Sequence, residues 1–417
     1  MHLEDGMIEL TDQRKARLLG SLLHDIGKFQ YRAEKTNVSH SENSAYFIRE
    51  FLGRIDVVKS ILEKSLVFAA DHHKEYADDF LRQADGLSAS ERVKDDHYFA
   101  HRPLLSIFRK LDIGKGSTPS ESWYVEPRAL NIDDIFPEKV DVEPSEWKPD
   151  VKTMREKHLD SWEKMKEEFL KIPKKVSFES LYDTIYYLLE RWTSRVCSAG
   201  YGFMPDISLF DHSRTVAAYA DCLAESTDKD KPFLVIEGDI SGIQNFIYKI
   251  ANPSDADQKR TSKILRGRSL YVNLLSDTAA DFILKELGLF KVHLLMNGGG
   301  HFHILSPNRE NIRKKIIELE KRINKWLIKE HHGELGIVIA SNEFSIDEVS
   351  DYSSVKRKMS SKLNQKKEKK NFDLIGEFNF FGPHEPGYTK EIWDVCKVCG
   401  GDMKKTKNRI CPVCSSH

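Results

Sequence analysis

The segment FLVIEGDISGIQNFIY, residues 233–248, decides the fold of the second half of the chain. Its first four residues are apolar and Gly238 follows them closely, a pattern typical of a buried strand that ends in a turn. Beyond it the sequence predicts two helices and three more strands. These elements span residues 262–287 (helix), 292–296 (strand), 302–305 (strand), 309–329 (helix) and 335–340 (strand). The order β-α-β-β-α-β predicts a ferredoxin-like domain.

Upstream of this segment, apolar residues recur at spacings of three and four, as Leu19, Leu22 and Ile26 do, which predicts amphipathic helices. The helices are expected at residues 16–29, 43–52, 57–73, 76–85, 151–171, 178–197 and 214–222. Residues 1–115 therefore look all-helical. Residues 115–149 are rich in Pro, Ser, Asp and Glu and lack periodicity, which predicts a linker or a long surface loop.

The composition is typical of a chain with several globular domains. Of its 417 residues, 40% are hydrophobic and 31% charged, which excludes a collagen-like, low-complexity or wholly disordered chain. The net charge of -1 gives no overall field toward nucleic acid or membrane. No apolar run approaches the roughly 18 residues of a membrane span, and the polar first residues do not resemble a signal peptide. We expect a soluble, cytoplasmic protein.

Histidine and aspartate residues recur on the early predicted helices. His24 and Asp25 are adjacent in LLHDIGK, and more potential metal ligands follow within 61 positions. These are His40, Asp71, His72, His73 and Asp85. Imidazole nitrogens combined with carboxylates suit transition metals better than Mg²⁺. Such metals generate an attacking hydroxide at phosphorus, so the composite predicts phosphodiester or phosphomonoester hydrolysis. A lone His-Asp pair could equally serve at a helix end.

The glycines around the first strand predict a second site. Gly238 and Gly242 permit a tight strand-to-helix turn, whose helix N-terminus favours phosphate. Asp239 supplies a carboxylate that palm-type nucleotidyl transferases place there. The hairpin NGGGHF, residues 297–302, has Gly300 and His301 where a metal-binding carboxylate pair would stand. We expect no nucleotidyl transfer by this domain alone. Its glycine turn could let the backbone approach a nucleotide, with a plain hairpin turn as the alternative.

Four of the six cysteines cluster late in the sequence, as two CxxC pairs separated by eleven residues. They are Cys396, Cys399, Cys411 and Cys414. Four thiolates at this spacing predict a tetrahedral Zn²⁺ site. Because four protein ligands leave no open position, we expect this zinc to be structural.

In sequence order, LLHDIGK, EGDISGIQNFIY, KILRGRSLYVNLL, NGGGHFHIL and the four late cysteines resemble the large subunit of type III CRISPR effector complexes, most of all subtype III-A (Csm). Further matching strings are ADGLSASER, PLLSIF and PDISLFDHSRTVAAYA at residues 205–220. The resemblance covers nearly the whole chain, from Leu18 to Cys414.

The resemblance implies that the HD domain cuts single-stranded DNA with Mn, Ni or Co ions. It also implies that paired palm domains make cyclic oligoadenylates from ATP when target RNA binds. His24 and Asp25 then correspond to catalytic metal ligands, and His72, His73 and Asp85 to further ligands, with His40 unassigned. The positions facing ATP would be Ser241, Gly298, Gly299 and Gly300. The implied partners are guide and target RNA and other subunits of the complex, especially the small and repeat-tag-binding subunits.

The sequence departs from the family pattern because it contains no GlyGlyAspAsp hairpin and no second palm. We expect a split or shortened gene, or a truncated form, with the second palm on a separate chain.

The overall prediction is an α+β protein. It comprises an all-helical HD-type domain at 1–115, a linker and helical segment at 116–225, a ferredoxin-like palm at 226–390 and a four-cysteine zinc module at 391–417. Two other functions stay open, a non-catalytic scaffold subunit of a ribonucleoprotein and an HD phosphohydrolase that acts on small nucleotides.

Overall fold

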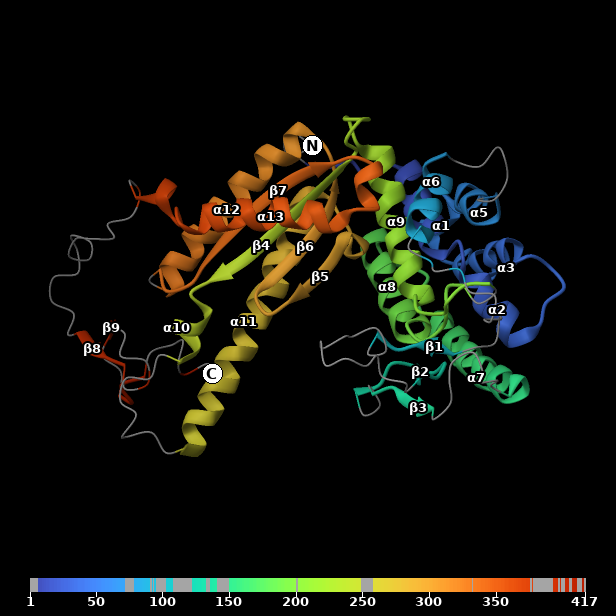
Figure 1. Ribbon diagram of the computed structural model, residues 1–417, viewed down its shortest axis with the longest axis horizontal. Coiled ribbons are helices and arrows are strands. Elements are labelled where there is room, and N and C mark those ends of the chain that lie inside the picture. The colour runs from blue at the N-terminus through green and yellow to red at the C-terminus, as the bar shows by residue number, and fades with distance from the viewer. Residues whose placement is uncertain are drawn as a thin grey trace.

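The computed structural model describes most of the chain. The described residues are 7–71, 79–90, 92, 94, 103–107, 122–132, 136–140, 150–199, 202–248, 258–331, 333–375, 377, 393–396, 398, 402–404, 407–410 and 415. Figure 1 shows a body of helices on one side and a sheet covered by helices on the other, with α9 (Leu209–Glu225) running between them.

The helical body contains α1 to α9. Besides α9 they are α1 (Asp12–Leu23), α2 (Ile26–Glu34), α3 (His40–Phe47), a π-helical turn (Ile48–Leu52), α4 (Asp56–Lys59), α5 (Leu62–Asp71), α6 (Asp79–Ala89), α7 (Val151–Leu170) and α8 (Phe178–Thr193). Ser208 is the N-cap residue of α9, and its Oγ accepts a hydrogen bond of 2.9 Å from the Asp211 backbone N–H.

The predicted helix at 16–29 is two helices. Helix α1 ends at Leu23, His24 and Asp25 form a turn, and α2 begins at Ile26. The apolar stripe does not reveal this break, because Leu22 at the end of α1 and Ile26 at the start of α2 are both buried in one core. His24 and Asp25 therefore lie in the turn between the two helices and not on the face of one helix.

A small antiparallel sheet contradicts two sequence predictions. Its strands, in the order β1-β2-β3, are β1 (Leu104–Leu105), β2 (Ser122–Val125) and β3 (Glu138–Val140). The prediction that residues 1–115 are all-helical is wrong at β1, and the prediction of a linker over 115–149 is wrong at β2 and β3. Strands of two to four residues are too short to produce the alternation of apolar and polar residues by which strands are recognised.

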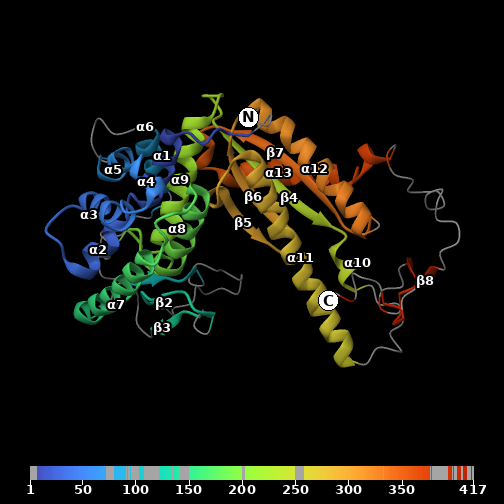
Figure 2. The ribbon, with the colours of Figure 1, turned by 180° about the vertical axis from the view of Figure 1, so that it is seen from behind.

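The predicted ferredoxin-like order is confirmed. The elements are β4 (Phe233–Ser241), α10 (Ile243–Tyr248), α11 (Gln258–Leu287), β5 (Leu294–Gly298), β6 (His301–Pro307), α12 (Glu310–His331) and β7 (Gly336–Phe344), followed by α13 (Tyr352–Lys367). All pairings in the sheet, whose order is β5-β6-β4-β7, are antiparallel. Figure 2 shows α11 and α12 on the side of the sheet that faces the viewer.

The two faces of this sheet differ in chemistry. Ile236, Ile240 and Phe302 point toward the core formed with α11 and α12. Gly238 lies opposite Phe302, and a Cβ on this glycine would lie 2.0 Å from the Phe302 ring, so the phenyl group fills the place of the missing side chain. On the other face, Val235 contributes to the core that includes residues of α9 and α13. The polar residues of β4 also lie on that face.

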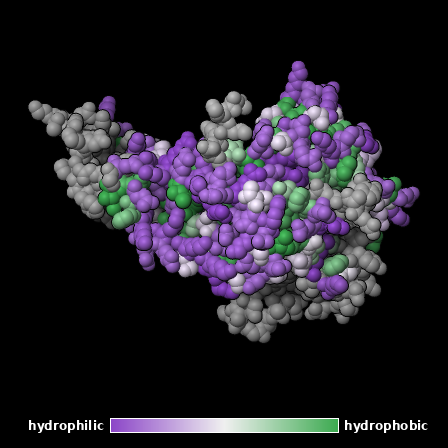
Figure 3. Space-filling model, turned by 90° about the horizontal axis from the view of Figure 1, so that it is seen from above, coloured by the Kyte–Doolittle hydropathy of each residue, from purple (hydrophilic) through white to green (hydrophobic). Residues whose placement is uncertain are grey.

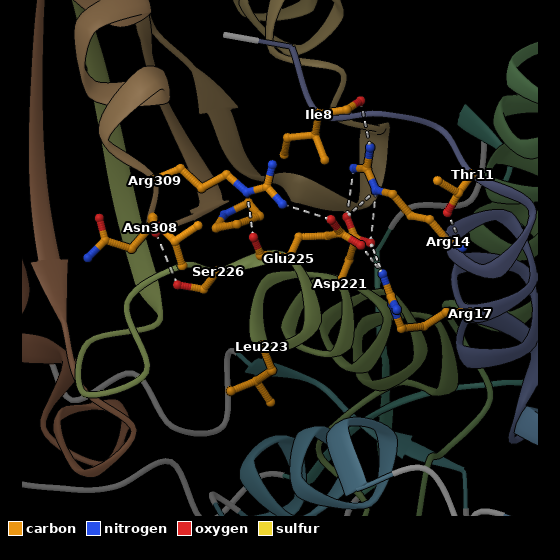
Figure 4. A network of polar contacts seen from close by, with 12 residues as sticks. Ile8, Thr11, Arg14, Arg17, Asp221, Leu223, Glu225, Ser226, Asn308 and Arg309 are labelled. Carbon is orange, nitrogen blue, oxygen red and sulfur yellow. Dashed lines mark hydrogen bonds and ion pairs between the residues drawn. The ribbon is translucent and has the colours of Figure 1, made fainter.

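A buried network of ions fixes α9 between the two bodies (Figure 4). Asp221 of α9 accepts hydrogen bonds from Arg14 of α1, with Nη2 at 2.7 Å, and both side chains are almost fully buried. One turn later, Glu225 pairs with Arg17 of α1 and with Arg309, which follows β6, at 3.0 Å. The same helix therefore holds the helical body and the sheet together.

Surface hydropathy gives no sign of a membrane segment. Figure 3 shows a mostly hydrophilic face with scattered hydrophobic patches. Within the described ranges, no helix combines the length and the apolar character that crossing a bilayer requires.

Candidate metal centre

Four side chains from three places in the helical body converge on one point. They are His24 and Asp25 of the α1–α2 turn, Asp85 of α6 and His212 of α9, and their ligating atoms all lie within 4.8 Å of one another. His212 Nε2 lies 3.2 Å from Asp25 Oδ2 and 3.1 Å from Asp85 Oδ1. The corresponding distances from His24 Nε2 are 3.5 and 3.7 Å. Figure 1 shows α1, α6 and α9 side by side.

The remaining hydrogen bonds orient both imidazoles toward the carboxylates. His24 Nδ1 donates to the Ser21 carbonyl at 2.8 Å, which directs its Nε2 toward the centre of the group. His212 Nδ1 lies 2.9 Å from Ser88 Oγ on α6. The tautomer in which His212 Nδ1 donates to that hydroxyl has its Nε2 lone pair toward the carboxylates. Metal-binding histidines are commonly fixed by such a bond from the second nitrogen.

A glycine brings His40 to the edge of the same group. The Gly27 backbone N–H donates to Ser44 Oγ at 2.9 Å, and a Cβ on Gly27 would lie 2.0 Å from the His40 carbonyl oxygen. Helices α2 and α3 can therefore approach this closely only with glycine at position 27. As a result, His40 Nε2 lies 3.5 Å from Asp25 Oδ1, the oxygen not directed at His212.

The electrostatics keep the carboxylates ionised. Burial works to raise the pKa of Asp25, but the Lys28 ammonium, followed by His24 and His212, lowers it well below its ordinary value. Burial opposes ionisation of Asp85 as well, but the neighbouring His212 and His24 side chains lower the Asp85 pKa. Burial works to lower the pKa of His24, but the charge of Asp25 and contact with Asp85 outweigh it and raise that pKa. Two anionic oxygens thus face two imidazoles in a buried site.

This group of donors fits a transition metal. Ligand bonds of about 2.0–2.2 Å put neighbouring ligand atoms about 3.0–3.5 Å apart, and the four nitrogen-to-oxygen distances are 3.2, 3.1, 3.5 and 3.7 Å. Mixed nitrogen and oxygen ligands favour Mn, Fe, Co, Ni or Zn over Mg²⁺. Two carboxylates this close repel each other, and Lys28 contacts only Asp25, so the site is suited to hold further positive charge.

The sequence predicted three of the four converging residues. His24, Asp25 and Asp85 lie together, whereas His72 and His73 fall outside the described residues. Asp71 ends α5, and its side chain is also outside that set. His212 was missed as a ligand because it follows His24 by 188 positions. The sequence nevertheless contains an indication of His212, because this residue lies in the string PDISLFDHSRTVAAYA, which is part of the family resemblance.

The predicted nucleotide-facing residues lie where β4 ends and where β5 turns into β6, at one end of the palm strands. Ser241, at the end of β4, donates its hydroxyl to the Gly336 carbonyl of β7 at 3.2 Å. Gly298 and Gly299 are exposed, and a Cβ on either would meet no atom within 4 Å. Gly300 is buried, and a Cβ there would lie 2.4 Å from Ile243. The first two glycines offer open backbone to a ligand, and Gly300 packs against Ile243 at the start of α10.

Of the four predicted zinc ligands, only Cys396 is described. It is buried and forms a small core with Val398, next to Ile264 and Ile410. Cys399, Cys411 and Cys414 lie outside the described residues.

Two family models match separate parts of the chain, one in the helical body and one in the palm. Residues 6–95 match the HD domain, and residues 232–379 match the domain described as Csm1 subunit domain B. His212 lies in neither matched range, although it contributes to the group of side chains that His24, Asp25 and Asp85 form.

Similar proteins cover most of this chain. It is 30% identical over 95% of its length to the CRISPR system single-strand-specific deoxyribonuclease Cas10/Csm1 (subtype III-A) of Methanocaldococcus jannaschii, covering 56% of that protein. It is 28% identical, again over 95% of its length, to the Thermococcus onnurineus protein of the same name, covering 53% of it. The chain therefore spans about half the length of the curated relatives it matches.

The fold agrees with solved structures. One is a chain of a Csm1-Csm4 subcomplex in the type III-A CRISPR-Csm interference complex, with a TM-score of 0.66 and 24% sequence identity. The match covers 88% of this chain and 50% of that chain. Csm1 of T. onnurineus matches with a TM-score of 0.62 and 23% identity, over 87% of this chain and 50% of its own. The chain is therefore similar to Cas10/Csm1 large subunits of subtype III-A over most of its length, and it combines a match to the HD domain with a match to Csm1 subunit domain B.

Proposed function

We propose that the chain is a metal-dependent nuclease that cuts single-stranded DNA within a type III-A CRISPR complex. The convergence of His24, Asp25, Asp85 and His212 is the observation that carries this proposal. It is supported by the HD-domain match and by the names of the relatives, which are single-strand-specific deoxyribonucleases. We also propose that segment 116–225 works with 1–115 as one nuclease unit, because α9 carries His212.

In this proposal the four ligands hold Mn, Co or Ni, with His40 beside the second oxygen of Asp25. A metal bound there would lower the pKa of a water and take charge from a phosphate oxygen. Asp25 and Asp85 retain their negative charge because their pKa values are lowered. Lys28 contacts Asp25, and Arg92 Nη2 lies 3.3 Å from both ring nitrogens of His212. Two cationic side chains beside the site would attract a phosphodiester.

Removal of metal is expected to stop cleavage. The purified chain should degrade single-stranded DNA in Mn²⁺, lose the activity in EDTA and regain it when Mn²⁺ is restored, because the ligands alone cannot activate water. The measurement is gel analysis of end-labelled single-stranded and double-stranded DNA of one sequence, with Mg²⁺ as the metal control. Intact DNA at stoichiometric Mn²⁺ would favour the scaffold function. Hydrolysis of nucleotides but not of DNA would favour the small-nucleotide phosphohydrolase.

We propose further that the palm supplies half of a nucleotide site and that another chain supplies the second palm. The match to domain B supports this, as do solved structures of similar fold, the Csm1-Csm4 cassette in complex with ATP and with cA4. Gly298 and Gly299 would face ATP with open backbone. The proposed partners are a Csm4-like repeat-tag-binding subunit, the small subunits, and guide and target RNA. The palm is assigned to residues 226–390.

For residues 391–417 we propose a structural Zn²⁺ held by Cys396, Cys399, Cys411 and Cys414. One zinc per chain is expected by elemental analysis after dialysis against a weak chelator, and alkylation of Cys396 should be slow until the zinc is removed. Cys197 and Cys222 are buried and serve as unreactive internal controls. Zinc-free protein whose late cysteines react at once would contradict the proposal.

A further inference from the structure

The palm sheet carries a second group of metal-binding side chains, separate from the site in the helical body. Glu237 of β4 and His301 and His303 of β6 offer ligating atoms that all lie within 4.8 Å of one another. The sheet register places Glu237 directly opposite His303 and Asp239 directly opposite His301. Because alternate residues of a strand share a face, these four side chains form a square on one side of the sheet.

The ligand atoms lie close enough together to share one cation. His301 Nε2 and His303 Nε2 are 2.7 Å apart, His303 Nε2 lies 3.1 Å from Glu237 Oε1, and His301 Nε2 lies 3.9 Å from Glu237 Oε2. Ligands bonded at about 2.1 Å in a tetrahedron lie about 3.4 Å apart, so the two nitrogens, which lie at hydrogen-bond distance here, would separate slightly around a cation. Two imidazole nitrogens and a carboxylate thus point at one another, as they would around a cation.

Asp239 provides an independent indication. Its Oδ2 lies 3.1 Å from Nδ1 of His301, the nitrogen on the far side of the ring from the other ligands. A hydrogen bond from His301 Nδ1 to this carboxylate leaves Nε2 with its lone pair directed at His303 and Glu237. A carboxylate bound to the outer nitrogen of a ligating histidine is the common support of zinc sites. Lys367 contacts the same carboxylate at 2.9 Å and balances its charge.

The burial of the group leaves one side open. The side chains of Glu237 and His303 are 2% and 4% exposed, whereas those of His301 and Asp239 are 28% and 22% exposed. An ion bound here would be enclosed by the sheet and reached from the side of His301, next to the turn at Gly300. Two histidines and one glutamate, with a fourth position left for a small ligand, make up the ligand set of several zinc enzymes.

We propose that Glu237, His301 and His303 bind a Zn²⁺ ion on the palm sheet, with Asp239 as the positioning residue for His301 and one coordination position open to water or a phosphate oxygen. The site uses none of the nuclease ligands and none of the four cysteines. It gives the palm a metal of its own at the place where the sequence lacks a carboxylate pair.

The test counts metal ions on the full chain. Equilibrium dialysis with Co²⁺, followed by elemental analysis, should give one ion fewer per chain in His301→Ala than in the parent protein. The absorption of tetrahedral Co²⁺ should decrease with it. Asp239→Asn should retain the ion at saturation but bind it about 10–100-fold more weakly. Glu343→Gln, which changes an exposed carboxylate of β7 on the same sheet, is the control and should change neither value.

Two further variants make the result decisive. His301→Gln keeps a polar side chain of similar size, and thermal melts of both His301 variants will show whether the fold is retained. His24→Ala should remove a different ion, so that the double variant His24→Ala with His301→Ala loses two. Failure of the nuclease proposal would leave the loss at His301 unchanged. Equal Co²⁺ stoichiometry and affinity in the parent protein, His301→Ala and His301→Gln would overturn the proposed palm site.

Discussion

Alanine in place of His212 is expected to lower the rate of metal-dependent cleavage of single-stranded DNA by at least about a hundredfold. His212 Nε2 approaches both Asp25 and Asp85 more closely than His24 Nε2 does. Loss of a residue that only supports a ligand costs about 10–100-fold in metal affinity or activity. Removal of the ligand itself should cost at least as much as the upper figure. The measurement is the initial cleavage rate at saturating Mn²⁺.

The neighbouring Asp211 provides a matched control for His212. Its side chain is half-exposed and pairs with Arg214 on the surface of α9, so Asp211→Asn should retain the parental rate. His24→Ala is the reference for loss of a ligand and should be as inactive as His212→Ala. Binding of Mn²⁺ measured by calorimetry separates the loss of metal from misfolding. A His212→Ala chain that cleaves within threefold of the parent rate would remove His212 from the site.

The second large effect is expected at Asp221, where alanine should lower the free energy of unfolding by about 3–5 kcal/mol. The Arg14 side chain is 1% exposed, and its guanidinium donates hydrogen bonds to this carboxylate, the shortest from Nη2 at 2.7 Å. Without Asp221 a buried cation loses its counterion and cannot reach water. The change in the urea midpoint, at an unchanged slope, measures the effect.

The control for this variant lies on the same helix. Asp211→Ala removes an exposed ion pair with Arg214 and should cost no more than about 1 kcal/mol. Asp221→Asn keeps the shape of the side chain, and it should also be strongly destabilised because the lost charge dominates. A cost for Asp221→Ala no larger than that for Asp211→Ala would show that the buried pair with Arg14 does not hold α9 against α1.

Acid should reveal the same interaction in the parent protein. Burial works to raise the pKa of Asp221, but Arg14, followed by His293, lowers it below its ordinary value of 3.8. A carboxylate whose pKa is lowered in the folded state contributes its full stabilisation above the unfolded value and loses it as the pH falls toward the folded value. The stability difference between the parent protein and Asp221→Asn should therefore be constant near neutrality and shrink below about pH 4.

The sequence predicted the features that depend on long, regular patterns. The apolar run at 233–236 marked the first strand, and the helices at 262–287 and 309–329 are long enough to show their period, so together they identified the ferredoxin-like order. The strands of the small sheet were missed because they are short. The break at His24 and Asp25 was missed because the apolar stripe continues from Leu22 to Ile26 across the turn.

The site was predictable only where its residues are close in the sequence. His24 and Asp25 are adjacent, and Asp85 follows on a helix of the same body, so the residue types and spacing sufficed. His212 arrives on α9 through tertiary contacts that no local pattern encodes. In the palm, the sequence analysis looked for paired aspartates and therefore did not consider His301 and His303 as metal ligands. The strand register, which the sequence does not reveal, places them opposite Asp239 and Glu237.

The position of α9 has a consequence for how such chains can be recombined. This one helix carries His212 at its start and Asp221 and Glu225 near its end, where they bond to Arg14 and Arg309. A chimaera that transplants only residues 6–95 from one homologue into another would inherit three of the four donors and rely on a foreign scaffold for the last. A chimaera joined after residue 225 would instead transfer His24, Asp25, Asp85 and His212 together.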